Sequence, residues 1–162
     1  VLINNAGNAY GLDSFENGDL DDWESMMDIN VKGLLYVSKA VIKKMMPRKS
    51  GHIINIGSTA AKTVYAKGNV YCASKHAVDA LTKGMRVDLK EHNIKVGAVH
   101  PGFTKTEFSE VRFHGDKERA DKVYSDIVSL EPEDLADIIH FVISRPYHVN
   151  ISDLVAMPIT QD

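Results

Sequence analysis

Hydrophobic and polar residues follow one another along the chain in a pattern that predicts alternating strands and helices. Short apolar runs of strand length lie at Val1 to Ile3, His52 to Gly57, Ile94 to Val99 and Leu154 to Met157. The longer segments between them carry apolar residues at the three- and four-residue spacing of a helix with one buried face. This alternation predicts an α/β fold with a doubly wound parallel sheet, in which ligands bind beyond the carboxyl ends of the strands.

The first helical segment, Asp19 to Met46, carries one polar residue on its apolar stripe. Asn30 follows Trp23 by seven residues and therefore falls on the buried face. Burying an amide without a hydrogen-bond partner costs about 1 to 3 kcal/mol. We therefore expect Asn30 to have partners, either backbone groups at a helix kink or an ordered water.

The second helical segment, Tyr71 to His92, begins with a chemically useful pair. Tyr71 and Lys75 are four residues apart, so both side chains project from one helix face. A phenol with a pKa near ~10 is a poor acid or base at neutral pH, and a neighbouring ammonium should lower that pKa. Ser58 follows the second strand, where its hydroxyl could bind the same substrate oxygen as Tyr71.

Two further helical features carry expectations. Gly84 lies inside the helical segment that begins at Tyr71, where glycine costs up to about 1 kcal/mol relative to alanine. We therefore expect a close helix contact there, such as one across a subunit interface. A last helix is expected over Glu131 to Arg145, with Pro132 in its first turn and Pro146 after its end.

Composition and charge narrow the class of protein. The 162 residues are 44% hydrophobic and 25% charged with a net charge of −3, which predicts one globular domain over residues 1–162 and gives no basic field for nucleic acid. No apolar run approaches the ~18 residues of a membrane span. The single cysteine, Cys72, is expected to pack in a helix interface and favours a reducing cytoplasm.

The seven histidines were considered as metal ligands. None of them shows the His-x-x-x-His spacing of a helical metal site, and no Cys-x-x-Cys pair is present. The sequence therefore predicts no metal site. His100, directly before Pro101, is interpreted as a loop residue.

Four separate elements together resemble the short-chain dehydrogenase/reductase family. They are Asn4-Asn5-Ala6-Gly7 after the first strand, Asn30, Ser58, and Tyr71 with Lys75. The resemblance implies hydride transfer between a nicotinamide and a hydroxyl-bearing carbon. It implies that Tyr71 transfers the proton, Ser58 steadies the reacting oxygen, Lys75 lowers the tyrosine pKa and contacts the nicotinamide ribose, and Asn30 anchors a water linked to that lysine.

The same resemblance implies a set of residues that contact NADP, with NAD not excluded. They lie after the first and third strands and at the start of the second helix: Asn4, Ala6, Gly7, Tyr71, Lys75, Pro101, Gly102, Thr104 and Thr106.

Residues 103–130 form a long connection that suits a substrate lid. Within it, the run Thr106 to Phe113 followed by Gly115-Asp116 is similar to one subgroup, the NADP-dependent serine and 3-hydroxy acid dehydrogenases, which includes L-allo-threonine dehydrogenases. Arg112 is flanked by two apolar residues. A guanidinium matches a carboxylate in shape, so Arg112 is expected to bind the substrate carboxylate together with Ser58 at the reacting oxygen.

Alternatives remain open at this point. Within the same family, a 3-oxoacyl-carrier-protein or sugar-alcohol reductase would share Asn30, Ser58, Tyr71 and Lys75 and differ in the lid. From another class, the chain could be a non-catalytic scaffold that retains the fold. The resemblance also implies a homotetramer.

The glycine-rich turn with which family members begin is missing from this chain. The first strand corresponds to the fourth strand of the family, so roughly 80 to 90 residues of a doubly wound domain are expected to precede it in a longer protein.

Overall fold

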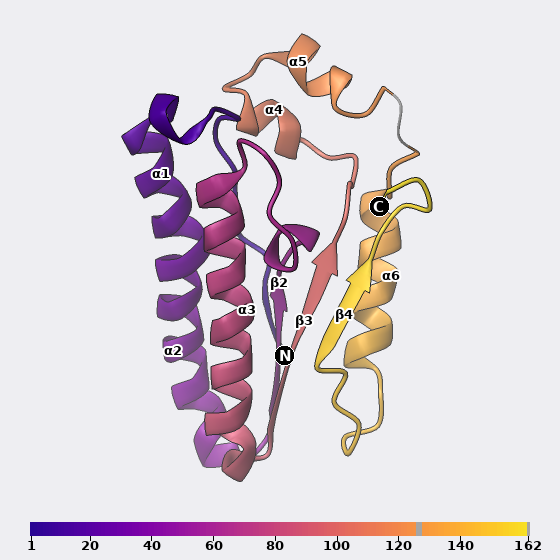
Figure 1. Ribbon diagram of the computed structural model, residues 1–162. Helices are drawn as coiled ribbons and strands as arrows, with labels where there is room; N and C mark the ends of the chain where they lie inside the picture. Colours follow the sequence, from indigo (N-terminus) through magenta and orange to yellow (C-terminus); the bar gives the residue numbers. More distant parts are fainter. Residues whose placement is uncertain (126–127, 162) are drawn as a thin grey trace.

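Four strands form one parallel sheet in the computed structural model, which describes residues 1–125 and 128–161 (Figure 1). The strands are β1 (Leu2–Asn4), β2 (Gly51–Ile56), β3 (Ile94–Pro101) and β4 (Asp153–Ala156), and their spatial order is β1-β2-β3-β4. All three neighbouring pairs are parallel. The carboxyl ends of the strands therefore meet at one edge of the sheet, and the predicted α/β fold with a parallel sheet is confirmed.

Helices cover both faces of this sheet. On one side lie α1 (Leu20–Met27), the π-helical segment η2 (Asp28–Gly33), α2 (Leu34–Met45) and α3 (Asn69–Leu89), and on the other lies α6 (Pro132–Ile143) (Figure 1). The short helices α4 (Phe108–Arg112) and α5 (Lys117–Lys122) lie beyond the carboxyl ends of the strands. Single 3₁₀ turns occur at Phe15–Asn17, Met46–Arg48, Thr59–Ala61 and Lys90–His92.

The core consists of one apolar layer on each face of the sheet. Successive strand residues point to opposite faces, so Ile53 packs with Met45 and Leu89 on the side of α2 and α3. Ile54 packs with Val142 of α6 on the other side. Strands buried on both faces need continuous apolar runs, which explains why β2 and β3 lack strict alternation.

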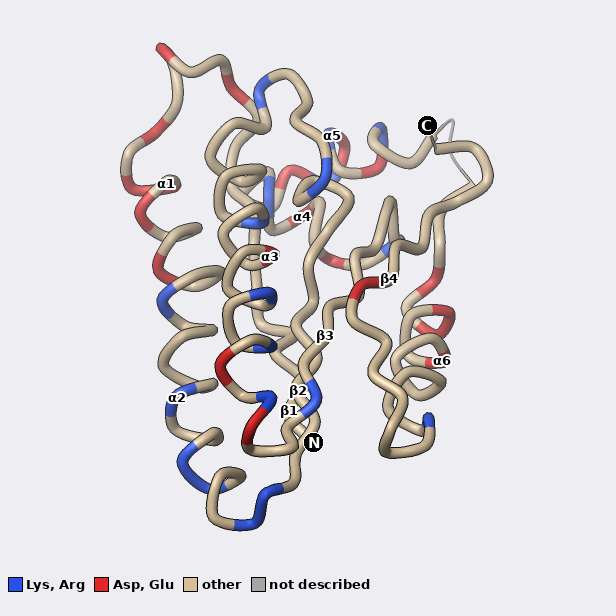
Figure 2. Tube along the Cα trace, turned by 60° about the horizontal axis from the view of Figure 1, so that its bottom comes forward, with Lys and Arg blue, Asp and Glu red and all other residues tan. Residues whose placement is uncertain are grey.

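The long helical run from α1 to α2 begins where the sequence predicts. The Asp19 carboxylate accepts hydrogen bonds from the backbone N–H groups of Asp21 (2.8 Å) and Asp22 (3.1 Å), which caps the helix. Acidic residues cluster at this end and basic residues at the far end of α2, as the helix dipole favours (Figure 2). The π-helical segment in the middle, which contains Asn30, was not predicted.

One expectation is wrong. His100 is not a loop residue, because β3 continues through His100 to Pro101, and the imidazole is fully buried. At Gly84 an added Cβ would have no described heavy atom of this chain within 4 Å, so the helix contact expected there is not made inside the chain and stays a prediction for a subunit interface. The sequence pattern did not indicate that β3 includes His100 and Pro101, because the apolar run is followed at once by a Pro-Gly turn.

Other expectations hold with small shifts. The last helix begins with Pro132 at its first position, and Glu131 and Asp134 form a reciprocal capping box. Cys72 is buried in an apolar cluster with Tyr71 and Met26, as expected of a packing residue. Part of the predicted lid, residues 126–127, lies outside the described residues.

Within the part of the chain that the structure describes, no helix is both long enough and apolar enough to cross a membrane.

Candidate active site

Ser58, Tyr71 and Lys75 converge at the carboxyl edge of the sheet. Ser58 caps the 3₁₀ turn after β2, with its Oγ accepting a hydrogen bond from the Ala60 N–H (3.1 Å), and its hydroxyl also hydrogen-bonds the Tyr71 phenol. Lys75 Nζ lies 5.9 Å from the centroid of the Tyr71 ring and donates to the Ile56 carbonyl (3.1 Å). Three groups from β2 and α3 thus surround one position where a reacting oxygen can bind.

Burial dominates the electrostatics of this group. Tyr71 and Lys75 are only 7% and 6% exposed. Burial raises the pKa of Tyr71 above its usual value, and the hydrogen bond from Ser58 opposes that rise only in part. Burial also lowers the pKa of Lys75 to about 8. The expected lowering of the phenol pKa by Lys75 is therefore wrong for this structure, because burial raises that pKa and the groups that lower it are Ser58 and Arg112.

Asn30 has the backbone partners that its buried position required. Its Oδ1 accepts from the N–H of Asn8 (2.8 Å), and its Nδ2 donates to the Asn8 carbonyl (2.8 Å) and to Ser74 Oγ (3.0 Å). The partners come from the loop after β1 and from α3, rather than from the helix itself. Asn8 and Ser74 were missed by sequence reasoning, because nothing in their spacing relates them to Asn30.

The loop after β1 passes directly beside this site. A Cβ at Gly7 would lie 3.1 Å from Asn30 Oδ1 and 3.3 Å from Lys75 Nζ, so a side chain there would crowd both groups. Gly7 and Ala6 are exposed. The Asn4 side chain points into the fold instead, where its Nδ2 donates to Ser38 Oγ (2.9 Å) and Asn55 Oδ1 (2.8 Å).

The segment after β3 is folded by local hydrogen bonds. Gly102 N–H donates to the Ala156 carbonyl (2.7 Å), which ties the Pro101-Gly102 turn to β4. The Thr104 hydroxyl donates to the Gly102 carbonyl (3.1 Å), and the Thr106 hydroxyl accepts from the N–H of Phe108 (3.1 Å). Both threonines therefore shape the loop that leads from the sheet edge to α4.

The lid residues bring a cation above the phenol. The Arg112 guanidinium carbon lies 5.7 Å from the Tyr71 ring centroid and 5.6 Å from that of Tyr65. Its Nε donates to the Gly11 carbonyl (2.9 Å) and its Nη1 to the Tyr65 hydroxyl (2.9 Å). The Phe108 ring packs on Tyr71 with centroids 5.6 Å apart. Tyr65 was missed because it lies in an irregular segment without a pattern.

These surroundings suit a polar ligand that bears ribose and a nicotinamide. An ammonium has three hydrogens to donate, and Lys75 gives one of them to the Ile56 carbonyl. Beside it run the exposed backbone of Ala6 and the side-chain-free surface of Gly7. A flat ring and a sugar can approach such a surface closely, so the residues present fit a dinucleotide.

Comparisons with known proteins agree with this geometry. NADP-dependent 3-hydroxy acid dehydrogenase YdfG of Escherichia coli (strain K12) is 46% identical over 162 residues, which cover 99% of this chain and 65% of that protein. The NADP-dependent 3-hydroxy acid dehydrogenase of Schizosaccharomyces pombe is 40% identical over 158 residues, which cover 98% of this chain and 61% of that protein. The chain thus spans less than two thirds of the length of these curated relatives.

A solved structure described as the closed form of serine dehydrogenase complexed with NADP+ superposes with a TM-score of 0.97 at 46% identity, covering 99% of this chain and 65% of that one. The family model for short chain dehydrogenase matches residues 1–117, which contain Ser58, Tyr71 and Lys75. This chain belongs to the short-chain dehydrogenase family.

Proposed function

We propose that the complete protein is an oxidoreductase that transfers a hydride between NADP and the hydroxyl-bearing carbon of a small 3-hydroxy acid. The observation that carries this proposal is the convergence of Ser58, Tyr71 and Lys75 beneath the guanidinium of Arg112. The 3-hydroxy acid dehydrogenases and the serine dehydrogenase that resemble this chain support the same reaction class.

The bound nicotinamide supplies the hydride chemistry, and the side chains manage the proton and the position of the substrate. In the oxidative direction, the phenolate form of Tyr71 accepts the hydroxyl proton of the substrate. Ser58 holds that oxygen, and its hydrogen bond to Tyr71 counteracts the effect of burial on the phenol pKa. Lys75 contributes positive charge beside the phenol and a donor for the ribose, and Asn30 keeps the loop after β1 against α3.

NADP is the proposed cofactor because the similar proteins are named for it. Within this chain its nicotinamide half would lie along two segments of the carboxyl edge. These segments contain Asn4, Ala6, Gly7, Tyr71 and Lys75 on one side and Pro101, Gly102, Thr104 and Thr106 on the other. Asn4 would contribute its backbone, since its side chain is engaged inside the fold.

A carboxylate is the proposed recognition group of the substrate. Arg112 uses Nε and Nη1 on Gly11 and Tyr65, its guanidinium carbon lies 5.7 Å from the Tyr71 ring centroid, and its Nη2 has no hydrogen-bond partner among the described residues. A carboxylate one or two carbons from the reacting hydroxyl can accept hydrogen bonds from such a group. Serine, allo-threonine and 3-hydroxypropionate have this geometry.

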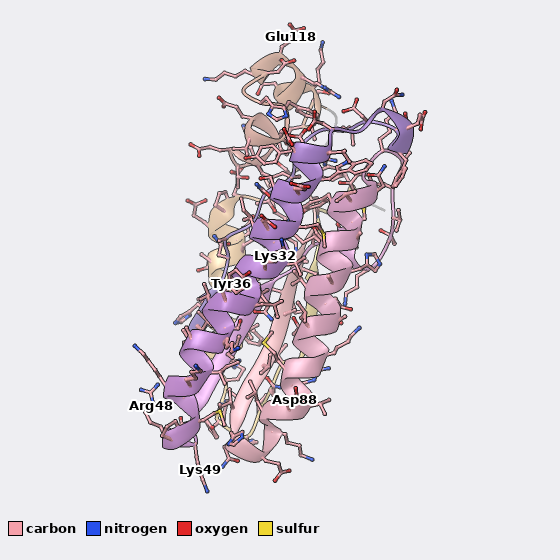
Figure 3. The ribbon with its side chains drawn as sticks, turned by 90° about the vertical axis from the view of Figure 1, so that its left-hand side faces the viewer. Lys32, Tyr36, Arg48, Lys49, Asp88 and Glu118 are labelled. Atoms are coloured by element: carbon pink, nitrogen blue, oxygen red, sulfur yellow. The ribbon has the colours of Figure 1, made fainter. Side chains whose placement is uncertain are left out.

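A homo-oligomer in the cytoplasm is the proposed state of the protein. The outer surfaces of α2 and α3 lie side by side (Figure 3) and expose Tyr36 (69%) and Val87 (74%). Exposed apolar side chains on adjacent helices favour association with a second copy.

The test is an assay of the full-length gene product with NADP and each of serine, L-allo-threonine and 3-hydroxypropionate, following absorbance of the reduced nicotinamide.

Tyr71→Phe should abolish nearly all turnover, because it removes the proton acceptor, while NADP binding measured by calorimetry stays intact. Tyr36→Phe is the matched control. Turnover of Tyr71→Phe within about tenfold of wild type would refute the assignment. If the protein is active only on 3-oxoacyl thioesters, these thioesters replace the small 3-hydroxy acids as the substrate class.

A further inference from the structure

The imidazole of His100 contacts the backbone of Ser58, the residue that carries the hydroxyl of the proposed site. His100 Nδ1 lies 3.4 Å from the Ser58 backbone nitrogen and 3.2 Å from its carbonyl oxygen. The ring packs on Gly57, where an added Cβ would lie 2.2 Å from Nδ1. Only glycine before Ser58 allows this approach.

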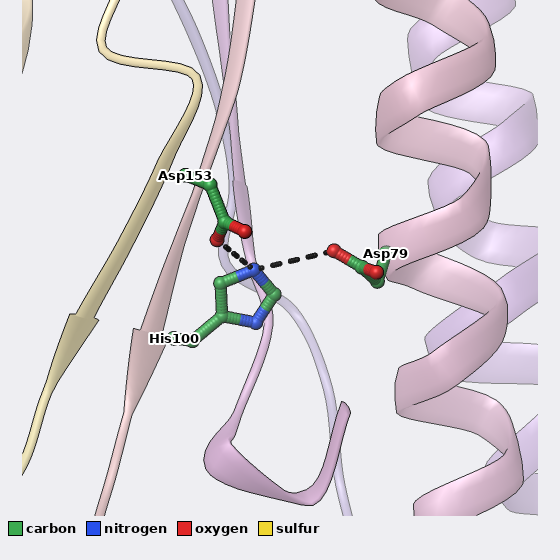
Figure 4. Close-up of side chains that lie close together, drawn as sticks. All are labelled: Asp79, His100 and Asp153. Carbon is green, nitrogen blue, oxygen red and sulfur yellow. Dashed lines mark ion pairs between the residues drawn. The ribbon is translucent and has the colours of Figure 1, made fainter. Parts of the chain in front are cut away.

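The other ring nitrogen faces a network of charges from three further elements (Figure 4). His100 Nε2 lies 3.0 Å from Asp153 Oδ1 of β4 and 3.6 Å from Asp79 Oδ1 of α3. The Lys62 ammonium bridges the same carboxylates, 3.0 Å from Asp79 and 2.8 Å from Asp153. Lys83 pairs with Asp79 from the solvent side.

This network contains the ligand atoms of a possible metal site, which sequence spacing did not reveal. One ligand atom from each of Asp79, His100 and Asp153 lies within 4.8 Å of the others. The Lys62 ammonium already supplies a cation to both carboxylates. Charge balance therefore favours an internal ion network that fixes the imidazole over a site for an added cation.

Both backbone groups of Ser58 lie within reach of Nδ1, which accepts from the Ser58 N–H in one tautomer and donates to the Ser58 carbonyl in the other, so the ring contacts this residue in either form. Nε2 has no hydrogen-bond partner among the described residues, although it lies near the two carboxylates. Burial and the nearby Lys62 lower the pKa of His100, while Asp153, the Ser58 backbone and Asp79 raise it to a smaller extent. The ring is therefore neutral at physiological pH.

We propose that His100 is a positioning residue for catalysis, which orients the Gly57–Ser58 peptide so that the Ser58 hydroxyl meets Tyr71. The inference rests on the proposed function and assigns a role in it to a residue other than Asn30, Ser58, Tyr71 and Lys75. Ser58 is the second residue after β2, and its direction is set by the contact of its backbone with His100 together with the hydrogen bond that its Oγ accepts from the Ala60 N–H. A misplacement of about 1 Å at such a group costs on the order of 10²-fold in rate.

Two substitutions separate the two sides of the ring. His100→Asn puts an amide near the position of Nδ1, so a hydrogen-bonding group still faces the Ser58 backbone. His100→Gln puts an amide near the position of Nε2, so a hydrogen-bonding group still faces Asp79 and Asp153. In the complete protein we expect His100→Gln to lower kcat about 30-fold with KM for the hydroxy acid within about threefold, and His100→Asn to restore most of that loss. Gly57→Ala, which displaces the ring, should lower kcat like His100→Gln.

Lys83→Met, at the solvent side of the network, is the control and should leave kcat unchanged. Equal kcat in His100→Asn and His100→Gln, or kcat of His100→Gln within about threefold of wild type, would overturn the proposal.

Amide hydrogen exchange of residues 57–61 gives a readout that does not depend on activity. Exchange should speed up in His100→Gln and Gly57→Ala and stay slow in His100→Asn. Unchanged exchange in all three variants would also overturn the proposal. If wild-type protein transfers no hydride to the substrate panel, the proposed function fails, and the exchange experiment still decides whether His100 holds Ser58.

Discussion

At the scale of single residues, burial acts in opposite directions on two neighbouring groups of α3. Burial raises the pKa of Tyr71 and lowers that of Lys75 to about 8, because each group loses water around its charged form. Ser58 is the one neighbour whose hydrogen bond lowers the pKa of Tyr71. The position of its hydroxyl therefore matters for the acidity of the phenol and, in the proposed reaction, for holding the substrate.

Arg112→Met should weaken binding of carboxylate substrates selectively. A hydrogen bond to a charged group contributes about 1.5 to 3 kcal/mol, so we expect KM for a 3-hydroxy acid to rise about 10- to 100-fold while kcat changes less. The matching diol without a carboxylate should be oxidised no worse by the variant. Steady-state kinetics on both substrates checks this.

Arg119→Met provides the control for Arg112→Met. Arg119 lies in the same lid segment and stacks on Phe113, with its guanidinium carbon 4.3 Å from that ring centroid. The Arg119→Met variant should leave KM unchanged for both the 3-hydroxy acid and the diol. A rise in KM for the diol equal to that for the acid would mean that Arg112 shapes the lid without binding a carboxylate.

At the scale of elements, the helical run from α1 to α2 positions Asn30 beside the candidate site through its capped start and its π-helical segment. Its start is fixed by the Asp19 cap. Its π-helical segment presents Asn30 to the loop after β1. π-helical turns often occur at functional sites, where the extra residue redirects a side chain.

Removing that cap should destabilise the protein measurably. Asp19→Ala leaves the Asp21 and Asp22 N–H groups without the carboxylate, so we expect the free energy of unfolding in urea to fall by about 0.5 to 2 kcal/mol. Asp21→Ala removes an acidic residue of the same first turn that accepts no capping bond, and it should cost less. Equal losses in the two variants would show that general charge, and not capping, stabilises the start of α1.

At the scale of the whole molecule, the parallel sheet gathers groups that are far apart in sequence. Residues 7, 58 and 102 each follow a strand, and parallel pairing brings these three strand ends to one edge. Tyr36 of α2, labelled in Figure 3, and Val87 of the neighbouring α3 are both exposed. The molecule thus separates a site at the sheet edge from an apolar surface on its helices.

Charging that apolar surface should disrupt the proposed oligomer. In the complete protein, Tyr36→Glu combined with Val87→Glu places like charges where two copies would meet, so the mass measured by light scattering after size exclusion should fall. Phe15→Glu is the control, since Phe15 is also exposed but lies before α1. An unchanged mass in the double variant would exclude this surface as the interface.

The order of elements and the shared helix face of two candidate site residues were predictable because they depend on local pattern. Tyr71 and Lys75 share a helix face by spacing alone, and Asn30 was expected to have partners because it interrupts an apolar stripe. The identity of those partners, Asn8 and Ser74, was not predictable. Side chains that meet through tertiary contacts leave no periodic signal in one sequence.

Local pattern along the chain was enough to predict the strand and helix order, the parallel sheet and the pairing of a phenol with an amine one helical turn apart. The charge properties of that pair depend on packing, since desolvation is set by all the groups around it. Tertiary structure also decided that His100 lies buried in β3 between Ser58 and two carboxylates. The physical reason is that pattern fixes which face of an element is buried, whereas partners across elements are set by how the elements pack.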